Sequence, residues 1–315
     1  MAGEVGAVRT VLGDVEPGSL GFTLPHEHLY INQWRSPERF DYPLLTDDDD
    51  ILADELGLFV AAGGGTIVDA TTPNAGREPA RLRALAERTG VTVVMACGWY
   101  RAPYYLAEER IPESTVRSLA EGLIREIRDG EPSTGIRPGL IGEIGVEKGW
   151  VSPIEERTHR AAGQALAATG LPLLTHSVYG DVGLAQLDLF ELEGADPSRV
   201  AIGHADTTLD LGYLLRVVER GAWVMFDSLL DQRGRQRERS VRLVCDLVER
   251  GHLSQILLSL DVCRTAHLTF GGGGGFAYLA DQYLPRLLAA GLPEAAIRTL
   301  TFENPRRWLT IGGDA

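Results

Sequence analysis

The sequence predicts an α/β fold in which a short N-terminal hairpin precedes a single (β/α)₈ barrel, or TIM barrel. Eight short apolar runs recur along the chain, and helical patterns separate them. The 315 residues also satisfy the length of about 250 residues or more that such a barrel needs. Because no linker or change in composition divides the chain, we expect residues 1–315 to form one domain.

The predicted elements follow one another in barrel order. Val8–Leu20 reads as a hairpin that turns at Gly13-Asp14. The predicted strands are Gly21–His28, Gly65–Thr71, Val91–Gly98, Leu140–Val146, Pro172–Ser177, Val200–Ala205, Ala222–Asp227 and Ile256–Val262. Each run is almost continuously apolar, as expected for parallel strands that are covered on both faces. The helical patterns between them include Asp48–Ala62, Glu78–Thr89, Ser114–Asp129, Pro153–Thr169 and Ser240–Arg250.

Two predicted helices carry start signals. Thr46 precedes the acidic run Asp47–Asp50 and is expected to cap a helix whose first turn is acidic. The acidic run does not fit a calcium loop, because the glycine and the terminal glutamate of an EF-hand are missing. Ser152-Pro153-Ile154-Glu155 is typical of a capping box with proline in the first helical position.

Composition excludes several classes of partner and site. The formal net charge of −14 argues against binding to nucleic acid or to an anionic membrane. Cys97, Cys245 and Cys263 are too few and too scattered for a disulfide framework or a cysteine zinc site, which favours a reducing compartment. With no signal-peptide pattern in residues 1–17 and no apolar run long enough for a membrane span, we expect a cytoplasmic protein.

Polar side chains stand at the ends of five predicted strands. They are His26 and His28 on the first strand, Glu143 on the fourth, His176 on the fifth, His204 on the sixth and Asp261 on the eighth. Side chains alternate along a strand, so His26 and His28 share a face while Glu27 points away. Any one of these residues alone is most often a core residue or an ion-pair partner. Together they predict one site, because active sites of this fold lie at the carboxyl ends of the strands.

This residue set predicts a metal centre. Four imidazoles and two carboxylates suit zinc first, and also manganese, iron or cobalt. Because six ligands exceed one tetrahedral site, we expect two divalent ions that share and ionise one water. The predicted activity is therefore metal-assisted hydrolysis of a small molecule.

Several stretches in chain order resemble the phosphotriesterase-related family of the amidohydrolase superfamily. They are Gly21–His28, Ile141–Gly145, Thr175-His176, Ile202–Asp206, Leu258–Asp261 and Glu303-Asn304-Pro305. The resemblance implies that His26, His28 and Asp261 hold the more buried metal and that His176 and His204 hold the more exposed one. The best-known members bridge the metals with a carboxylated lysine. Glu143 stands at that position here, as in the glutamate-bridged branch, and Lys148 is the alternative bridge.

The resemblance also frames the expected reaction. A hydroxide that bridges the metals attacks a carboxylic ester, lactone or amide, and Asp261 acts as the catalytic proton acceptor. The alternatives are a phosphoester or phosphotriester hydrolase and a metal-binding protein without catalysis. Lactonase-like relatives carry an arginine soon after the seventh strand. The run Phe226–Leu230 lacks one, which argues against long-chain acyl lactones. Similar proteins are often dimers, so the resemblance also implies a homodimer.

The remaining polar residues, cysteine and glycines of interest lie outside the six predicted ligands, and some of them allow two interpretations. Tyr100 either contacts the substrate oxygen or forms a pocket wall. Arg264, and the cluster Arg233, Arg235, Arg237 and Arg239 expected in the loop after the seventh strand, are either solvated or bind an anionic substrate group. Gly271–Gly275 is expected to form a flexible lid. We interpret His159 and His252 as structural and Cys263 as a packing residue, and leave His267 unassigned.

Overall fold

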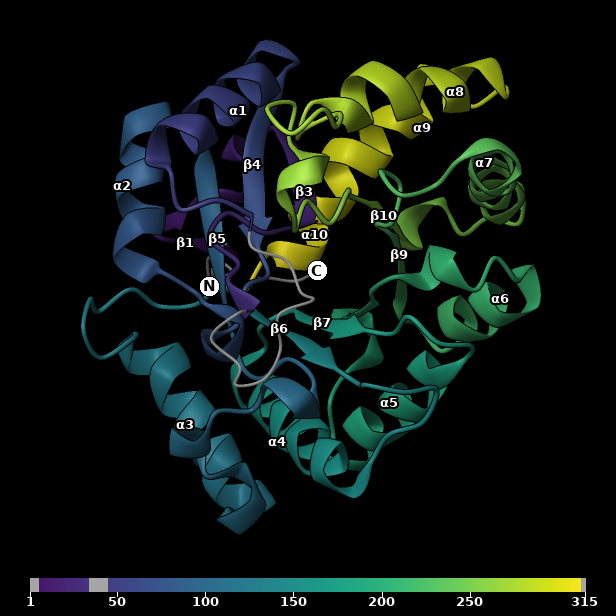
Figure 1. Ribbon diagram of the computed structural model, residues 1–315. Coiled ribbons are helices and arrows are strands. Elements are labelled where there is room, and N and C mark those ends of the chain that lie inside the picture. Colours follow the sequence, from purple (N-terminus) through teal and green to yellow (C-terminus); the bar gives the residue numbers. More distant parts are fainter. Residues whose placement is uncertain (1–5, 34–44, 313–315) are drawn as a thin grey trace, which may run out of the picture.

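The fold consists of a ring of strands surrounded by helices (Figure 1), in a computed structural model that describes residues 6–33 and 45–312. Eight parallel strands form one sheet whose order follows the chain. They are β3 (Phe22–Glu27), β4 (Gly64–Asp69), β5 (Thr92–Cys97), β6 (Leu140–Gly145), β7 (Leu173–His176), β8 (Val200–Ile202), β9 (Trp223–Phe226) and β10 (Ile256–Leu258). The predicted barrel is confirmed, and each strand lies within one residue of, or inside, its predicted run.

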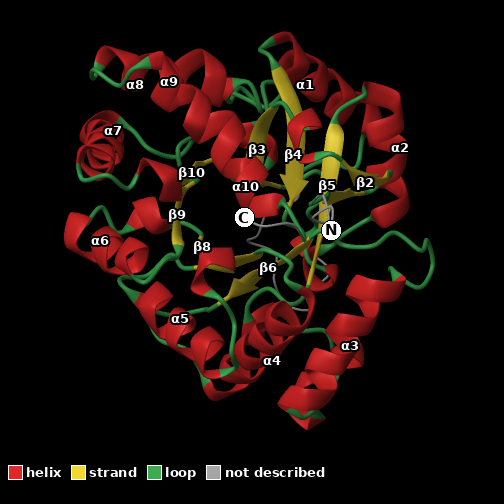
Figure 2. Cartoon of the chain, turned by 180° about the vertical axis from the view of Figure 1, so that it is seen from behind, coloured by secondary structure: helices red, strands yellow, loops and turns green. Residues whose placement is uncertain are grey.

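Helices follow the strands and lie outside the ring, as Figure 2 shows from behind, except that the last helix, Asn304–Leu309, lies across the middle of the ring. They are α1 (Asp49–Ala61), α2 (Pro79–Thr89), α3 (Val116–Asp129), α4 (Pro153–Thr169), α5 (Val182–Leu192), α6 (Leu211–Glu219), α7 (Gly234–Glu249), α8 (Leu284–Ala289), α9 (Glu294–Arg298) and α10 (Asn304–Leu309). Within the described ranges, none of them has the length and apolar character needed to cross a bilayer.

The predicted N-terminal hairpin is present, with its turn displaced. The strands β1 (Val8–Thr10) and β2 (Gly13–Val15) pair antiparallel, with Thr10 opposite Gly13. The turn is therefore Val11-Leu12, and Gly13-Asp14 opens the second strand instead of forming the turn. The Thr10 hydroxyl stabilises this turn, because it donates to the Gly13 carbonyl at 2.7 Å and accepts from the Leu12 amide at 3.1 Å.

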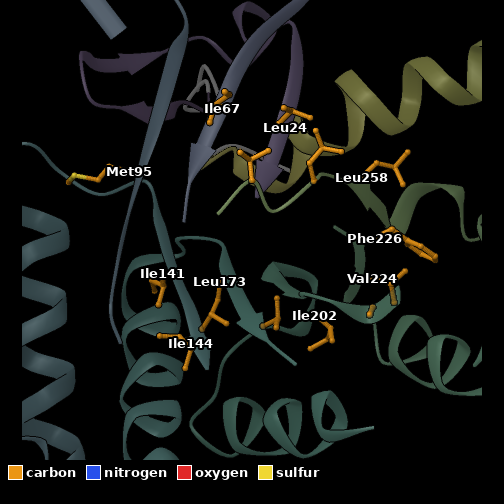
Figure 3. Close-up of a cluster of buried hydrophobic side chains, with 14 of the residues drawn as sticks. Leu24, Ile67, Met95, Ile141, Ile144, Leu173, Ile202, Val224, Phe226 and Leu258 are labelled. Carbon is orange, nitrogen blue, oxygen red and sulfur yellow. The ribbon is translucent and has the colours of Figure 1, made fainter. Parts of the chain in front are cut away.

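Alternation along the strands divides the apolar side chains between two clusters. Residues such as Ile67, Ile202 and Val224 belong to the cluster that joins strands to helices (Figure 3). Their neighbours fill the second cluster together with Trp308 and Leu309 of α10. It includes Val68, Val94, Leu140, Leu174, Ala201, Met225 and Leu257. Both clusters consist of buried apolar side chains, whereas the strands end in polar residues at the mouth of the barrel.

Helix starts agree with the sequence in one case and differ in two. Ser152 and Glu155 form the predicted capping box at α4. The cap of α1 is Asp48 and not Thr46, because the Asp48 carboxylate accepts from the amides of Asp50 and Ile51. Helix α7 begins at Gly234, before the predicted Ser240, since the run of Arg, Gln and Glu residues favours helix. Arg235, Arg237 and Arg239 therefore lie in a helix and not in a loop.

The barrel closes between β3 and the segment after β10 without regular pairing. No ladder joins these two strands in the described part of the chain, and they form the two ends of the sheet order. The amide of Asp261 donates to the His26 carbonyl, and the amide of His28 donates to the Val262 carbonyl, both at 3.2 Å. Residues 259–262 thus lie beside the end of β3.

Candidate metal centre

The structure brings the six predicted ligands together at the carboxyl ends of the strands. The side chains of His26, His28, Glu143, His176 and His204 are buried. The Asp261 side chain is 23% exposed, so it marks the side of the centre that faces solvent. The residues come from five different strand ends that are far apart in the sequence.

Glu143 lies among the four imidazoles. Its Oε2 is 2.8 Å from His176 Nδ1, 3.4 Å from His204 Nε2 and 3.6 Å from His26 Nε2, and its Oε1 is 3.6 Å from His28 Nε2. Although burial opposes ionisation, His176 and His204 hold the pKa of Glu143 well below its usual range. The Oε2 atom thus lies among His26, His176 and His204, and Oε1 faces His28.

The donor atoms form three compact groups, of which one consists of His26, His204 and Asp227 and the other two share Glu143. His26, His28 and Glu143 form the first of these two, and Glu143, His176 and His204 form the second. Asp261 adjoins the first group, because its Oδ1 is 3.2 Å from His28 Nε2 and 3.9 Å from His26 Nε2. These two groups therefore have one carboxylate in common.

Two observations test whether these residues fit a cation. His26 Nε2 is buried and has no hydrogen-bond partner within the described residues. His204 Nε2 and His176 Nδ1 lie 2.9 Å apart, a contact that needs a proton or a cation between the two lone pairs. Imidazole nitrogens and carboxylate oxygens are donors that Zn²⁺, Mn²⁺, Fe²⁺ and Co²⁺ accept. The residues present fit a divalent-metal site.

Residues that we did not single out in the sequence bind the Nδ1 atoms of His26, His28 and His204. Asp227 accepts from His26 Nδ1 at 2.7 Å and from His204 Nδ1 at 2.8 Å. Burial raises the pKa of the Asp227 carboxyl, but His204 and His26 lower it by more, so this carboxyl is ionised at neutral pH. His28 Nδ1 lies 2.8 Å from the Thr71 hydroxyl, which donates to Asp69. Such partners fix the ring orientation and tautomer of metal-binding histidines.

Tyr100 lies beside His176. Its ring packs edge-on against that imidazole at 4.9 Å, and its hydroxyl is 3.5 Å from His176 Nε2. Burial raises the pKa of Tyr100 well above its usual range, so the phenol keeps its proton at neutral pH. The side chain can therefore donate a hydrogen bond at the edge of the centre.

Arg264 and Lys148 both point to partners outside the centre. The Arg264 guanidinium forms an ion pair with Asp231, and its Nε donates to His267 Nε2 at 2.6 Å. His267 in turn lies 3.1 Å from the Asp261 carbonyl through Nδ1. The Lys148 side chain is exposed, and its ammonium lies 5.8 Å from the centre of the Trp150 ring. Within the described residues, Arg264 is thus already charge-paired.

The glycine run after β10, where we expected a flexible lid, forms a series of tight turns. The amides of Gly271 and Gly273 donate to the Leu268 carbonyl, and that of Gly275 donates to the His267 carbonyl. A β-carbon at Gly271 would collide with the Thr265 carbonyl, and one at Gly273 would collide with the His267 carbonyl. The run therefore packs tightly on the segment that carries His267.

Comparisons with known proteins find similar proteins over nearly the whole chain. The Phosphotriesterase family model matches residues 6–309. The chain is 31% identical over 288 residues to the phosphotriesterase homology protein of Escherichia coli (strain K12), covering 91% of this chain and 97% of that protein. The crystal structure of that protein, with phosphate in its active site, has a TM-score of 0.85 at 30% identity and covers 92% of this chain and 99% of that one.

Two further similar proteins carry names that describe their activity. The N-acetyltaurine hydrolase of Homo sapiens is 30% identical over 350 residues, which covers 97% of this chain and 98% of that enzyme. The crystal structure of a lactonase from Listeria monocytogenes has a TM-score of 0.88 at 27% identity and covers 98% of this chain and 100% of that one. The first name describes an amide substrate and the second describes a cyclic ester.

Proposed function

The chain belongs to the phosphotriesterase family, and on that premise we propose that it hydrolyses a carboxylic ester, lactone or amide. It is a metal-dependent hydrolase, as its relatives' names and its His/Glu/Asp cluster support. The observation that carries the proposal is the position of Glu143 in two of the donor groups, at the mouth of the barrel. The amidase and lactonase relatives support carbonyl substrates.

We assign the ligands in two sets. His26, His28 and Asp261 would hold one ion, His176 and His204 would hold the other, and Glu143 would contact both. The assignment follows the two donor groups that share Glu143 and the short Asp261–His28 distance. Zinc is the first choice for four imidazoles with carboxylates, and manganese, iron and cobalt share these donors.

The chain's own residues supply acid–base and orienting groups around the metals. Bound metal ions would provide Lewis acidity and lower the pKa of water. The Asp261 side chain is partly exposed. Burial raises its pKa, but hydrogen bonding to His28 outweighs this effect and the net pKa is lowered. The carboxylate is therefore ionised and able to accept a proton. The Tyr100 phenol can donate to the substrate oxygen that approaches His176.

An anionic substrate group would have to compete with Asp231 for Arg264. The Arg264 side chain is 47% exposed but is paired with that carboxylate. If a sulfonate or carboxylate of the substrate replaced Asp231 as the partner of Arg264, the guanidinium would keep an ion pair. The proposed role of Arg264 is therefore recognition by exchange of partners.

A substrate panel tests the proposal. We expect the zinc- and manganese-loaded protein to hydrolyse N-acyl amines, lactones or carboxylic esters faster than phosphoesters. Phosphoester hydrolysis is the second candidate, because the Escherichia coli relative has phosphate in its active site. A preference for phosphoesters would replace the first candidate with the second. Tight binding of metal with no turnover on the whole panel would favour a non-catalytic role.

Metal analysis tests the ligand assignment. We expect two ions per chain at saturation, and loss of activity when a chelator removes them. Glu143→Ala should lower the stoichiometry, because its carboxylate lies in two of the donor groups. Lys148→Ala is the matched control and should keep both ions and need no bicarbonate. A single ion at saturation, or a carboxylated Lys148 between two ions, would contradict the assignment.

A further inference from the structure

Glu27 lies between two proposed ligands but faces the other side of β3. Its side chain is fully buried. Its carboxylate accepts from the Ser259 hydroxyl at 2.6 Å, from the Leu260 amide at 2.9 Å and from the Val262 amide at 2.8 Å. One side chain of β3 therefore binds three donors of the segment that follows β10.

These hydrogen bonds join β3 to the segment after β10, where no strand ladder is present in the described residues. Because β3 and β10 have no regular pairing, the amides of residues 260 and 262 need other acceptors. A carboxyl side chain suits them, since its two oxygens can accept from both amides at once. Glu27 Oε1 takes the amide before Asp261, and Oε2 takes the amide after it.

Asp261 has a backbone conformation that its own side chain disfavours. Its φ is +52°, in the left-handed region. Such a conformation is uncommon for a residue with a β-carbon, and it persists where the surroundings hold it. Relaxation of Asp261 would rotate the peptide groups on either side of it. Of these two peptides, the one after Asp261 donates to Glu27 through the Val262 amide, and the one before it donates to the His26 carbonyl through the Asp261 amide.

We propose that Glu27 is a positioning residue that fixes Asp261 in the left-handed conformation and thereby directs the Asp261 carboxylate at the His26–His28 pair. The Asp261–His28 distance of 3.2 Å depends on this restraint. The inference rests on the proposed function, because it assumes that Asp261 takes part in hydrolysis. Glu27 itself contacts neither the substrate nor the imidazole nitrogens of the centre.

Glu27→Gln tests the inference, since an amide places a donor against one of these N–H groups. We expect kcat to fall about 10- to 100-fold, the usual effect of changing a residue that orients a ligand, with KM within about threefold. Glu55→Gln is the matched control. Glu55 is also buried and accepts the Phe270 amide in the same segment, at 2.8 Å, but away from Asp261. It should keep kcat within about threefold.

A double-mutant cycle separates positioning from general stability. If Glu27 acts through Asp261, the variant Glu27→Gln/Asp261→Asn should have the kcat of Asp261→Asn alone. Fully multiplicative losses would overturn the inference while leaving the role of Asp261 intact. Tm values of all variants, measured in parallel, separate loss of fold from loss of rate.

The crystal structure of Glu27→Gln provides a readout that needs no substrate. We expect Asp261 to leave the left-handed region and its carboxylate to move away from His28. An unchanged Asp261 conformation would overturn the inference even if activity falls. Conversely, absence of turnover in the wild-type protein would refute the proposed function, while this structural result would still decide the role of Glu27.

Discussion

The pairing of β4 with β5 and the closure between β3 and β10 are built in different ways. In the first region four consecutive pairs run from Thr66–Thr92 to Asp69–Met95, and neither strand carries a proposed metal ligand. In the second region no ladder forms, and side chains and single backbone bonds join the segments. The closure carries His26, His28 and Asp261. Regular strand pairing thus forms the barrel wall at β4 and β5, whereas the proposed ligands His26, His28 and Asp261 lie where pairing between strands is interrupted.

Other proposed ligands also lie at irregular positions. The β3–β4 register shifts between Leu24 and Glu27, where His26 stands. The β6–β7 register shifts between Ile141 and Ile144, where Glu143 stands. His204 has a φ of +54°. His176 is the exception, because it is in register with Gly145.

Asp261→Asn gives the largest expected effect at the irregular closure. Asparagine keeps the shape and a neutral oxygen for the metal but cannot accept the proton. We expect kcat to fall by about 10²–10⁴, the usual share of general acid–base catalysis. The measurement is kcat together with metal content, on a substrate whose chemical step limits the rate. If the metals remain and kcat stays within a few-fold, another group such as His267 carries the proton.

His159 sharpens the comparison, because it is a buried histidine that serves the fold. Its Nδ1 donates to the Glu155 carbonyl at 2.7 Å, and its Nε2 accepts from Gln186, whose amide also donates to the Ile144 carbonyl. Burial lowers the pKa of His159 to about 4, so the folded protein keeps this ring neutral. The structural interpretation from the sequence agrees with this position.

The unfolded chain binds a proton at His159 near pH 6.5, but the folded chain does so only near pH 4. The stabilisation by the neutral ring is therefore complete above pH 6.5 and is lost as the pH falls towards 4, by up to ~3 kcal/mol. His159→Asn should flatten this part of the profile. Urea unfolding at pH 7 and pH 5 measures it, and equal pH dependence in both proteins would contradict the prediction.

Asp227→Asn tests the support behind the metal centre. The amide can accept from one imidazole, but it would place a donor against the other, so His26 or His204 loses its orientation. We expect a loss of about 10- to 100-fold in metal affinity or kcat. Thr71→Val, which removes one neutral partner of His28, should cost less. Metal titration of both variants makes the comparison, and equal small losses would show that ring orientation is set elsewhere.

Ile67→Val tests the regular region and gives the smallest expected effect. Ile67 of β4 is fully buried in the cluster between strands and helices (Figure 3). Loss of one methyl group should lower the free energy of unfolding by about 0.5–1.5 kcal/mol and leave kcat unchanged. Chemical denaturation and a rate assay measure both. A larger loss of kcat than of stability would contradict the division between the two regions.

The sequence predicts the barrel and the proposed ligands because each signal is local. Apolar runs identify strands, and a polar residue at the end of such a run stands out. Contacts between distant loops have no such signal, so the Arg264–Asp231 pair and the Glu27 hydrogen bonds appear only in the structure. Asp227 is an intermediate case. It ends a predicted strand and could have been noticed by that criterion.

The glycine run near the mouth of the barrel matters for anyone who builds variant libraries of this enzyme. A repeat of five identical small residues carries little apparent information, and its place after the last strand invites randomisation to change substrate preference. Substituents at Gly271 and Gly273 would strike backbone carbonyls, which cannot rotate out of the way as side chains can. A scan of single substitutions should find these two codons among the least permissive near the site. Diversity is better placed at exposed aromatic positions on other loops, such as Trp150 and Tyr179.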